Sequence, residues 1–136
     1  MSTKRPVAPT ANFESQAFWN GTEKGQLLLQ KCGSCGAFRH PPAPICPACL
    51  SDNSEWIEAS GRGTVYTFVV VRETRARGWD QMVPYVIAVV TLEEGPRMVT
   101  NIVDVAPEDV KIDMPVEVKF AETDGSSAQL PLFRPL

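Results

Sequence analysis

All four cysteines of this chain belong to two Cys-x-x-Cys pairs that are separated by ten residues. They are Cys32, Cys35, Cys46 and Cys49. Two such pairs supply four thiolates that can surround one ion as a tetrahedron, an arrangement typical of structural zinc sites. Iron bound by four thiolates is the alternative, because ligand type alone does not separate the two metals. Four protein ligands leave no open coordination position. The pattern therefore predicts a structural metal that stabilises the fold and does not take part in catalysis.

The residues around the two pairs favour metal binding over redox chemistry. A redox Cys-x-x-Cys normally occurs singly near a βαβ pattern, and no such pattern is visible in this sequence. Each pair is expected to sit on a tight turn. Gly36 follows the first pair and can adopt a positive φ easily, whereas Leu50 follows the second pair, where glycine would be the easier residue. The second turn is therefore predicted to be the less ideal one.

The composition indicates one domain with a hydrophobic core, or one small domain together with a segment that a cross-link stabilises. The chain has 136 residues, of which 43% are apolar, and a net charge of −3 with a pI of about 5.1. This acidic balance argues against a protein that binds phosphate backbones. The N-terminus has no secretory pattern and no apolar run is long enough to span a bilayer, so we expect a cytoplasmic protein without membrane contact. Disulfides are then disfavoured, because the cytosol keeps thiols reduced.

The N-terminal part predicts a mobile tail followed by one short helix. Prolines in the first dozen residues block regular structure there. The segment 12–21 reads as a helix that Asn12 caps and that an Asn-Gly pair ends. Phe18 and Trp19 lie on or beside its apolar face, and two interpretations are open. Either these rings pack the helix onto its own domain, or they grip a partner.

From residue 26 onward the sequence alternates strand-like and turn-like segments with almost no helix. The expected strands are 26–32, a short one around 56–57, 61–75, a hairpin over 84–104, 115–123, and a tail over 130–136 that follows a turn at 124–129. The later strands fit a five-stranded OB-type barrel, although a sandwich or an SH3-like barrel would give a similar pattern. We divide the chain into 1–30 (tail, helix and lead-in strand), 31–58 (ribbon) and 59–136 (barrel).

The sequence offers few groups for catalysis. The single histidine, His40, lies between the cysteine pairs and is expected to be a solvated loop residue. Glu93 and Glu94 fall at a hairpin tip, where paired carboxylates are usually solvated. The serines have no histidine near them in sequence, and all four cysteines are assigned to the metal. We therefore expect the chain to have no catalytic activity on its own.

The densest positive cluster follows the most strand-like segment. It consists of Arg72, Arg75 and Arg77, with Trp79 close behind. A solvated loop is the simplest interpretation of this cluster. The functional interpretation is a cradle for phosphates or for the carboxylates of a partner, because guanidinium groups suit both. The indole could then stack on a purine or fill a pocket of the partner.

Several motifs, taken in order, resemble a known family. They are F-W-x-G at 18–21, G-x-L-x-L-Q-x-C-x-x-C-G at 25–36, C-P-x-C at 46–49, S-G-x-G-x-V at 60–65 and P-Y-V-I-A-V-V-x-L-E-E-G-P-R at 84–97, with T-N-I-V soon after. Each motif alone is weak, but their order resembles the zinc-ribbon plus OB-fold family of acyl-CoA-associated proteins. The resemblance covers nearly the whole chain, from about residue 13 to residue 133.

The resemblance implies a mainly β fold with an N-terminal helix, a rubredoxin-like zinc ribbon and a C-terminal five-stranded OB-fold barrel. It also implies a non-catalytic accessory subunit that binds a thiolase-like enzyme, of retro-aldolase or condensing type, as a heterotetramer of two plus two chains. Such a subunit would support acyl-CoA binding or channelling in steroid side-chain or lipid degradation. The four cysteines carry over as ligands of a structural Zn²⁺, no catalytic residue carries over, and a coenzyme A thioester is the expected ligand.

Three other functions compete with this interpretation. The chain could be the partner of a hot-dog-fold acyl-CoA hydratase, with which the same family is associated. It could be a module that binds single-stranded nucleic acid, since ribbons and OB barrels both do so, but the low pI argues against this. An autonomous acyl-CoA hydratase or hydrolase is disfavoured because the sequence supplies no convincing base.

Overall fold

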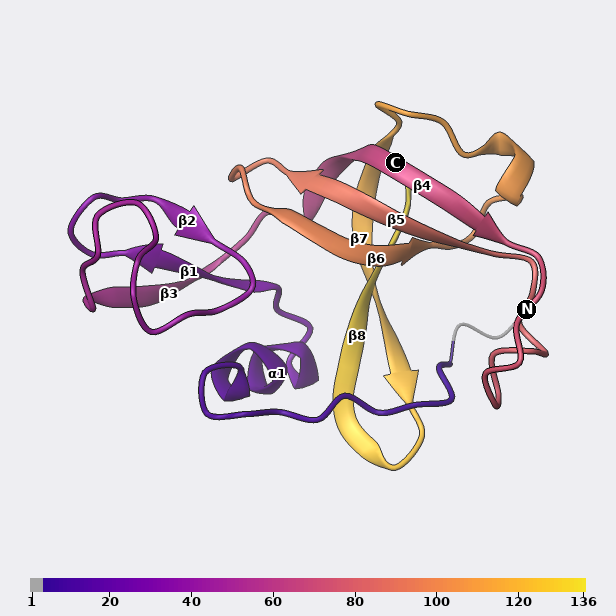
Figure 1. Ribbon diagram of the computed structural model, residues 1–136, viewed down its shortest axis with the longest axis horizontal. Coiled ribbons are helices and arrows are strands. Elements are labelled where there is room, and N and C mark those ends of the chain that lie inside the picture. The colour runs from indigo at the N-terminus through magenta and orange to yellow at the C-terminus, as the bar shows by residue number, and fades with distance from the viewer. Residues whose placement is uncertain (1–3) are drawn as a thin grey trace.

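The computed structural model describes residues 4–136 as one helix, a small sheet and a closed barrel, in that order along the chain (Figure 1). The elements are α1 (Gln16–Glu23), β1 (Leu28–Cys32), β2 (Phe38–Arg39), β3 (Ser54–Glu58), β4 (Arg62–Val71), β5 (Tyr85–Leu92), β6 (Arg97–Ile102), the 3-10 turn η1 (Pro107–Asp109), β7 (Pro115–Thr123) and β8 (Ser126–Pro135). Neither helical element of this part of the chain is long and apolar enough to cross a membrane.

The small sheet forms the ribbon and has the order β2-β1-β3. Its central strand, β1, pairs antiparallel with both neighbours, from Leu28 opposite Glu58 to Cys32 opposite Ser54 on the β3 side. The first cysteine pair therefore starts where β1 ends. The strands are short, between two and five residues, which leaves much of the ribbon in turns and loops.

The five remaining strands close into a barrel with the order β4-β5-β6-β8-β7. All pairings are antiparallel except the one between β6 and β8, where Ile102 lies opposite Phe133. A closed five-stranded barrel confirms the predicted architecture and excludes the open sandwich. β4 contains a bulge at Tyr66, which lies between the paired residues Val65 and Thr67. Such a bulge increases the local twist and helps one long strand pair with both β5 and β7.

A single apolar core joins the barrel to the helix and the ribbon. Its most deeply buried members are residues such as Val65, Val90 and Phe133 on the inward faces of the strands. Phe18 from α1 and Leu29 from β1 belong to the same cluster. The helix and the lead-in strand are therefore packed against the barrel, as their place in Figure 1 also suggests for α1 and β8.

The helix begins and ends later than predicted. Asn12 does not cap it; instead its Oδ1 accepts a hydrogen bond from the backbone N–H of Ser15 (2.8 Å), which forms a turn ahead of the helix. The Asn-Gly pair does not end it either. A Cβ on Gly21 would lie 2.8 Å from Leu28 Cδ1, so the glycine serves close packing inside the helix. The chain leaves the helix at Gly25, whose φ is +73°.

Both ends of the described chain, residues 4–136, have more regular structure than predicted, and the first three residues of the predicted mobile tail lie outside this range. The prediction of a mobile tail is wrong for Arg5, which forms a bridge with Thr123 and donates its backbone N–H to Glu122 O (2.9 Å). At the other end, the turn after β7 is confined to Asp124 and Gly125, and β8 is ten residues long. The predicted turn over 124–129 was therefore too long. β4 ends at Val71 and not at Arg75.

Candidate metal centre and binding surfaces

The four cysteines converge on one point. Their Sγ atoms all lie within 4.8 Å of one another, and two of the separations are 3.6 Å (Cys32 to Cys49) and 3.7 Å (Cys35 to Cys46). A Zn²⁺ ion with Zn–S bonds of about 2.3 Å would place its tetrahedral sulfurs about 3.8 Å apart. The thiols are free, without a disulfide among them. The donor set and its spacing therefore fit a structural zinc ion.

Backbone N–H groups stabilise the thiolate form of two ligands. Cys32 Sγ accepts hydrogen bonds from the N–H groups of Cys35 and Ser34, each at 3.4 Å, and these lower the pKa of Cys32 to about 6. The pKa of Cys46 is also lowered, chiefly by the backbone N–H of Cys49. A thiolate is the form that binds metal. The turns thus prepare the two buried cysteines, Cys32 and Cys46, for coordination.

The two turns are built alike despite their different sequences. Gly36 donates its N–H to Cys32 O (3.0 Å), and Leu50 donates its N–H to Cys46 O (2.8 Å). Their φ angles are +78° and +65°. The expectation that each pair sits on a tight turn is confirmed. The leucine adopts a left-handed conformation that costs roughly 1–2 kcal/mol more than it would cost glycine, because its Cβ approaches the following carbonyl oxygen.

A groove of about 500 Å³ lies where the helix, the ribbon and the barrel meet. We call it the α1–β6 groove. Its walls are formed by Phe18 and Trp19 of α1, His40, Pro41 and Pro42 of the ribbon, and barrel residues that include Ile87, Val99, Asn101 and Leu130. The walls are mostly apolar. They come from segments far apart in the sequence.

The two helix aromatics have different roles in this groove. Phe18 is only 4% exposed and belongs to the core, so it packs the helix onto its own domain. Trp19 is half-buried, lies edge-on to Phe18 with ring centroids 4.9 Å apart, and contributes to the groove wall. The interpretation that these rings pack the helix onto its own domain therefore holds for Phe18. The interpretation that they contact a partner stays open for Trp19.

His40 is not the solvated loop residue that was predicted. Its ring lies 5.4 Å from Phe18 between centroids, and Nδ1 is buried without a hydrogen-bond partner among residues 4–136. Burial lowers the pKa of His40. The preceding residue, Arg39, is buried as well and donates hydrogen bonds to Gln30 Oε1 (2.8 Å) and to the carbonyl of Ala43 (2.8 Å).

The outer face of the barrel continues the groove with exposed apolar side chains. Val69 and Ile87 lie opposite each other on β4 and β5, and Val89 lies opposite Val99 on β5 and β6. Val99 is 72% exposed and Val69 is 59% exposed. Apolar residues that cluster outside a sheet commonly mark an interaction surface. This face was not predicted, although the run PYVIAVV carries the signal: both faces of β5 are apolar, without the usual alternation of apolar and polar residues.

The arginine cluster lies in the loop 72–84, which contributes no residue to the α1–β6 groove. Arg72 forms an exposed ion pair with Glu108 (3.8 Å), and Arg75 and Arg77 are exposed, with no ion pair found for them in residues 4–136. Trp79 is half-buried, packs against Tyr85 at 5.3 Å between ring centroids, and does not join the groove. The structure thus separates Trp19 from the arginine cluster.

Glu94 holds the linker between ribbon and barrel, contrary to the predicted solvated tip. Its Oε2 accepts a hydrogen bond from the N–H of Ser60 (2.8 Å), while Oε1 is buried without a partner among the described residues. Glu93, its neighbour, forms the exposed ion pair with Arg62 (3.6 Å) that the prediction allows. The two carboxylates therefore differ in role.

Comparison with known proteins identifies the family. Residues 19–55 match the family model described as "ChsH2, rubredoxin-like zinc ribbon domain", and residues 56–121 match "ChsH2, C-terminal OB-fold domain". A "DUF35 domain-containing scaffold protein" of Pyrococcus furiosus is 38% identical over 119 residues, which cover 84% of this chain and 86% of that protein. The chain belongs to the DUF35 family. The predicted family resemblance, the zinc ribbon and the OB-fold barrel are confirmed.

Two further relatives are much longer than the region that matches this chain, whereas one solved structure matches over nearly its whole length. The "Probable enoyl-CoA hydratase alpha subunit" of Thermomonospora curvata is 38% identical over 93% of this chain, which spans only 39% of that protein. The "3-oxo-4,17-pregnadiene-20-carboxyl-CoA hydratase alpha subunit" of Mycobacterium tuberculosis is 36% identical over 85% of this chain and 36% of that protein. A solved chain described as "Ltp2-ChsH2(DUF35) aldolase" superposes with a TM-score of 0.85 at 38% identity, covering 94% of this chain and 98% of that one.

Proposed function

We propose that this DUF35 chain is a non-catalytic accessory subunit that binds a thiolase-like enzyme of retro-aldolase or condensing type and supports its use of an acyl-CoA. The observation that carries the proposal is the α1–β6 groove with its apolar extension over Val69, Ile87 and Val99. A surface of this kind suits burial against another protein. The solved relative whose description names an aldolase supports the choice of partner.

The chemistry of the surface favours binding over catalysis. The groove's one titratable side chain among the described residues is His40, whose pKa is lowered and whose Nδ1 is buried. No carboxylate, cysteine or lysine lines the groove to act with it. The four cysteines fill a metal shell and leave no open coordination position. An accessory role requires none of these groups to react.

Co-purification from the native host tests the identity of the partner. The tagged chain is expected to bring down a thiolase-like protein in equal amounts, as a heterotetramer of two plus two chains, measured by mass spectrometry and light scattering. The isolated chain is expected to show no hydration, thiolysis or aldol cleavage of acyl-CoA. Activity of the pure chain that a single substitution abolishes would contradict the accessory role.

The arginine cluster is the proposed contact for coenzyme A or for acidic residues of the partner. Guanidinium groups bind phosphates and carboxylates well, and Arg75 and Arg77 are exposed. Replacing both by alanine should leave the zinc and the fold intact. Because the residues are exposed, each lost contact is expected to cost up to about 1 kcal/mol.

The KM of the assembled complex for acyl-CoA and the elution volume of the complex measure the two outcomes separately. Arg62→Ala, which removes an exposed arginine paired with Glu93, is the control. A rise in KM for the double variant alone assigns the cluster to the ligand, and weaker assembly assigns it to the partner. If neither changes, the loop is only solvated.

A second candidate is partnership with an acyl-CoA hydratase of hot-dog fold. Its support comes from two relatives that are named as hydratase alpha subunits, each with more than half of its length outside the match. Recovery of a hydratase-type protein in place of a thiolase-like one would favour this candidate. Salt-sensitive binding of single-stranded DNA or RNA by the isolated chain would instead favour a nucleic-acid module.

A further inference from the structure

Arg5 is a buried cation that has no carboxylate partner among residues 4–136. The residue is only 3% exposed, and its backbone is fixed on β7 through Glu122 O and Asp124 N–H. Among residues 4–136, one terminal nitrogen donates to Met82 Sδ (3.8 Å), which is a weak acceptor, and the buried Nε has no hydrogen-bond partner. None of the ion pairs formed by residues 4–136 includes Arg5. A guanidinium so placed is costly to bury unless something pairs with it.

Aromatic rings compensate the charge only in part. The guanidinium carbon lies 5.6 Å from the centre of the Trp79 ring, and that indole packs on Tyr85. A cation–π contact stabilises a cation but accepts no hydrogen bond at Nε. Burial accordingly lowers the pKa of Arg5. Within the described part of the chain, the guanidinium of Arg5 therefore finds no strong hydrogen-bond acceptor.

A cavity of about 460 Å³ adjoins Arg5 at this end of the barrel. Most of its wall is apolar and comes from residues such as Tyr85, Val86, Ile102 and Val105. Its volume lies within the range of roughly 300–1,000 Å³ that is typical of small-molecule sites. In Figure 1 the first described segment of the chain (indigo) runs between the loop 72–84 and the β7–β8 hairpin.

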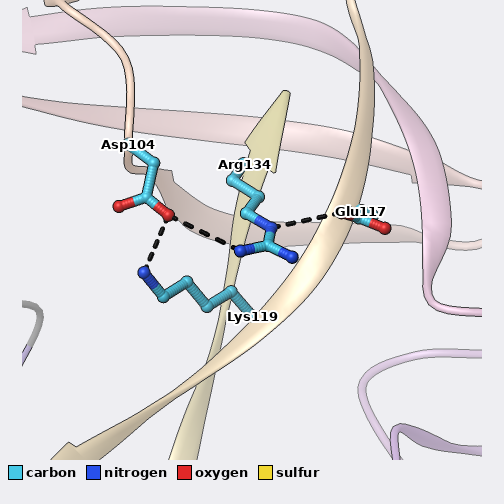
Figure 2. A network of polar contacts seen from close by, with 4 residues as sticks. All are labelled: Asp104, Glu117, Lys119 and Arg134. Carbon is cyan, nitrogen blue, oxygen red and sulfur yellow. Dashed lines mark hydrogen bonds and ion pairs between the residues drawn. The ribbon is translucent and has the colours of Figure 1, made fainter. Parts of the chain in front are cut away.

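The acid in the cavity wall is already engaged. Asp104 is the one carboxylate among the described lining residues, and its Oδ2 lies 2.7 Å from Lys119 Nζ and 4.0 Å from Arg134 Nη1. Arg134 in turn pairs with Glu117 (3.1 Å), as Figure 2 shows. Two cations share Asp104, so its charge is balanced without Arg5. The cavity thus keeps an unmatched positive group at one end.

We propose that this cavity binds a small organic anion, whose carboxylate or phosphate oxygens accept hydrogen bonds from Arg5 and whose apolar part lies against Val86 and Ile102. The fork of guanidinium donors matches both oxyanions. The site is separate from the α1–β6 groove, and its ligand does not depend on the proposed partner. It can therefore be tested on the isolated chain, whatever that chain assembles with.

An NMR titration of the isolated full chain provides the test, with the indole N–H of Trp79 as the reporter beside Arg5. The probes are hexanoate, phenyl phosphate and inorganic phosphate, with hexanol as the neutral control. We expect saturable shifts with hexanoate or phenyl phosphate, and the tighter of the two identifies the oxyanion. Arg5→Gln should weaken that binding about tenfold or more, because a charge-assisted hydrogen bond is lost. Arg97→Gln, an arginine stacked on Tyr66 outside the cavity, should bind as the wild type does.

A second variant keeps Arg5 and fills the cavity beside it. Ala106 is exposed at the rim of the cavity, and Ala106→Trp would fill the cavity from outside. This variant should lose binding while retaining the fold, even if Arg5→Gln fails to fold. The proposal is overturned if neither organic anion binds saturably, if hexanol binds equally well, or if Ala106→Trp and a folded Arg5→Gln bind as the wild type does.

Discussion

The ribbon and the barrel hold their shape in different ways. The ribbon has strands of two to five residues, and its most buried side chains near the loops are two metal-binding thiols, Cys32 and Cys46. The barrel closes around large apolar side chains such as Val90 and Phe133. A segment too short to build its own core can be stabilised by a metal whose binding free energy is also folding free energy. One chain can thus contain one region that metal coordination stabilises and another that apolar packing stabilises.

The two regions meet in surfaces that neither could form alone. Leu27 and Leu29 reach from the ribbon side into the common core, and Glu94 of the barrel binds the linker at Ser60. The α1–β6 groove takes Pro41 from the ribbon and Val99 from the barrel. A partner that recognises this groove therefore recognises the correct placement of both regions.

The largest expected effect comes from breaking the metal site. Cys46→Ser removes one of four thiolates and should release the metal and unfold the turns of the ribbon, because structural zinc contributes on the order of 10 kcal/mol in isolated zinc fingers. Metal content by elemental analysis and backbone NMR signals of residues 31–58 measure the loss. Barrel signals should largely persist. Ser51→Ala, which removes a hydroxyl bonded to Ser34 between the turns, should retain the metal.

The converse substitution should weaken the barrel and spare the metal. Phe133 is fully buried where β8 meets both β6 and β7, so Phe133→Ala should lower the free energy of unfolding by about 3–5 kcal/mol. Urea titration followed by circular dichroism gives the change. The folded variant should still hold one equivalent of metal. Loss of metal together with barrel stability would show that the two regions unfold as one unit.

A smaller effect is expected from His40 at the junction. Its folded pKa is lowered from 6.5 by burial, so below pH 6.5 the unfolded chain binds a proton that the folded chain does not. Unfolding is then favoured as pH falls, by at most about 1.4 kcal/mol per pH unit. Above pH 6.5 both states are neutral and the contribution disappears. Urea titrations at about pH 7.5 and about pH 5.5 should show a smaller loss for His40→Phe than for the wild type.

Local patterns in the sequence were sufficient for the metal site and the barrel strands. The cysteine spacing defines its own geometry, because each pair must form a turn, and the alternation in 115–123 identifies a strand. The residues at which helices and strands begin and end were predicted less accurately. Gly21 stays inside the helix because Leu28 packs on it, and that contact follows from the fold and not from the residues beside it.

The surfaces could not be predicted, because distant segments build them. Arg5 is buried by β7 and by the loop 72–84, and nothing in its neighbouring prolines indicates this. His40 looks like a loop residue until α1 brings Phe18 against it. Val99 reads as an ordinary strand residue. The apolar run over β5 indicates a second apolar face, but only the pairing of β5 with β6 shows that Val99 belongs to it.

Assembly of groove variants with the thiolase-like enzyme recovered from the native host tests the central claim most directly. Val99→Asp places a charge in the groove, whereas Ile112→Asp places the same charge on an apolar residue that is 54% exposed in the β6–β7 connection. Isothermal titration should show that Val99→Asp weakens assembly about tenfold or more while Ile112→Asp assembles like the wild type, with metal content and unfolding midpoint unchanged in both. Equal affinity of the two variants for the partner would contradict the account.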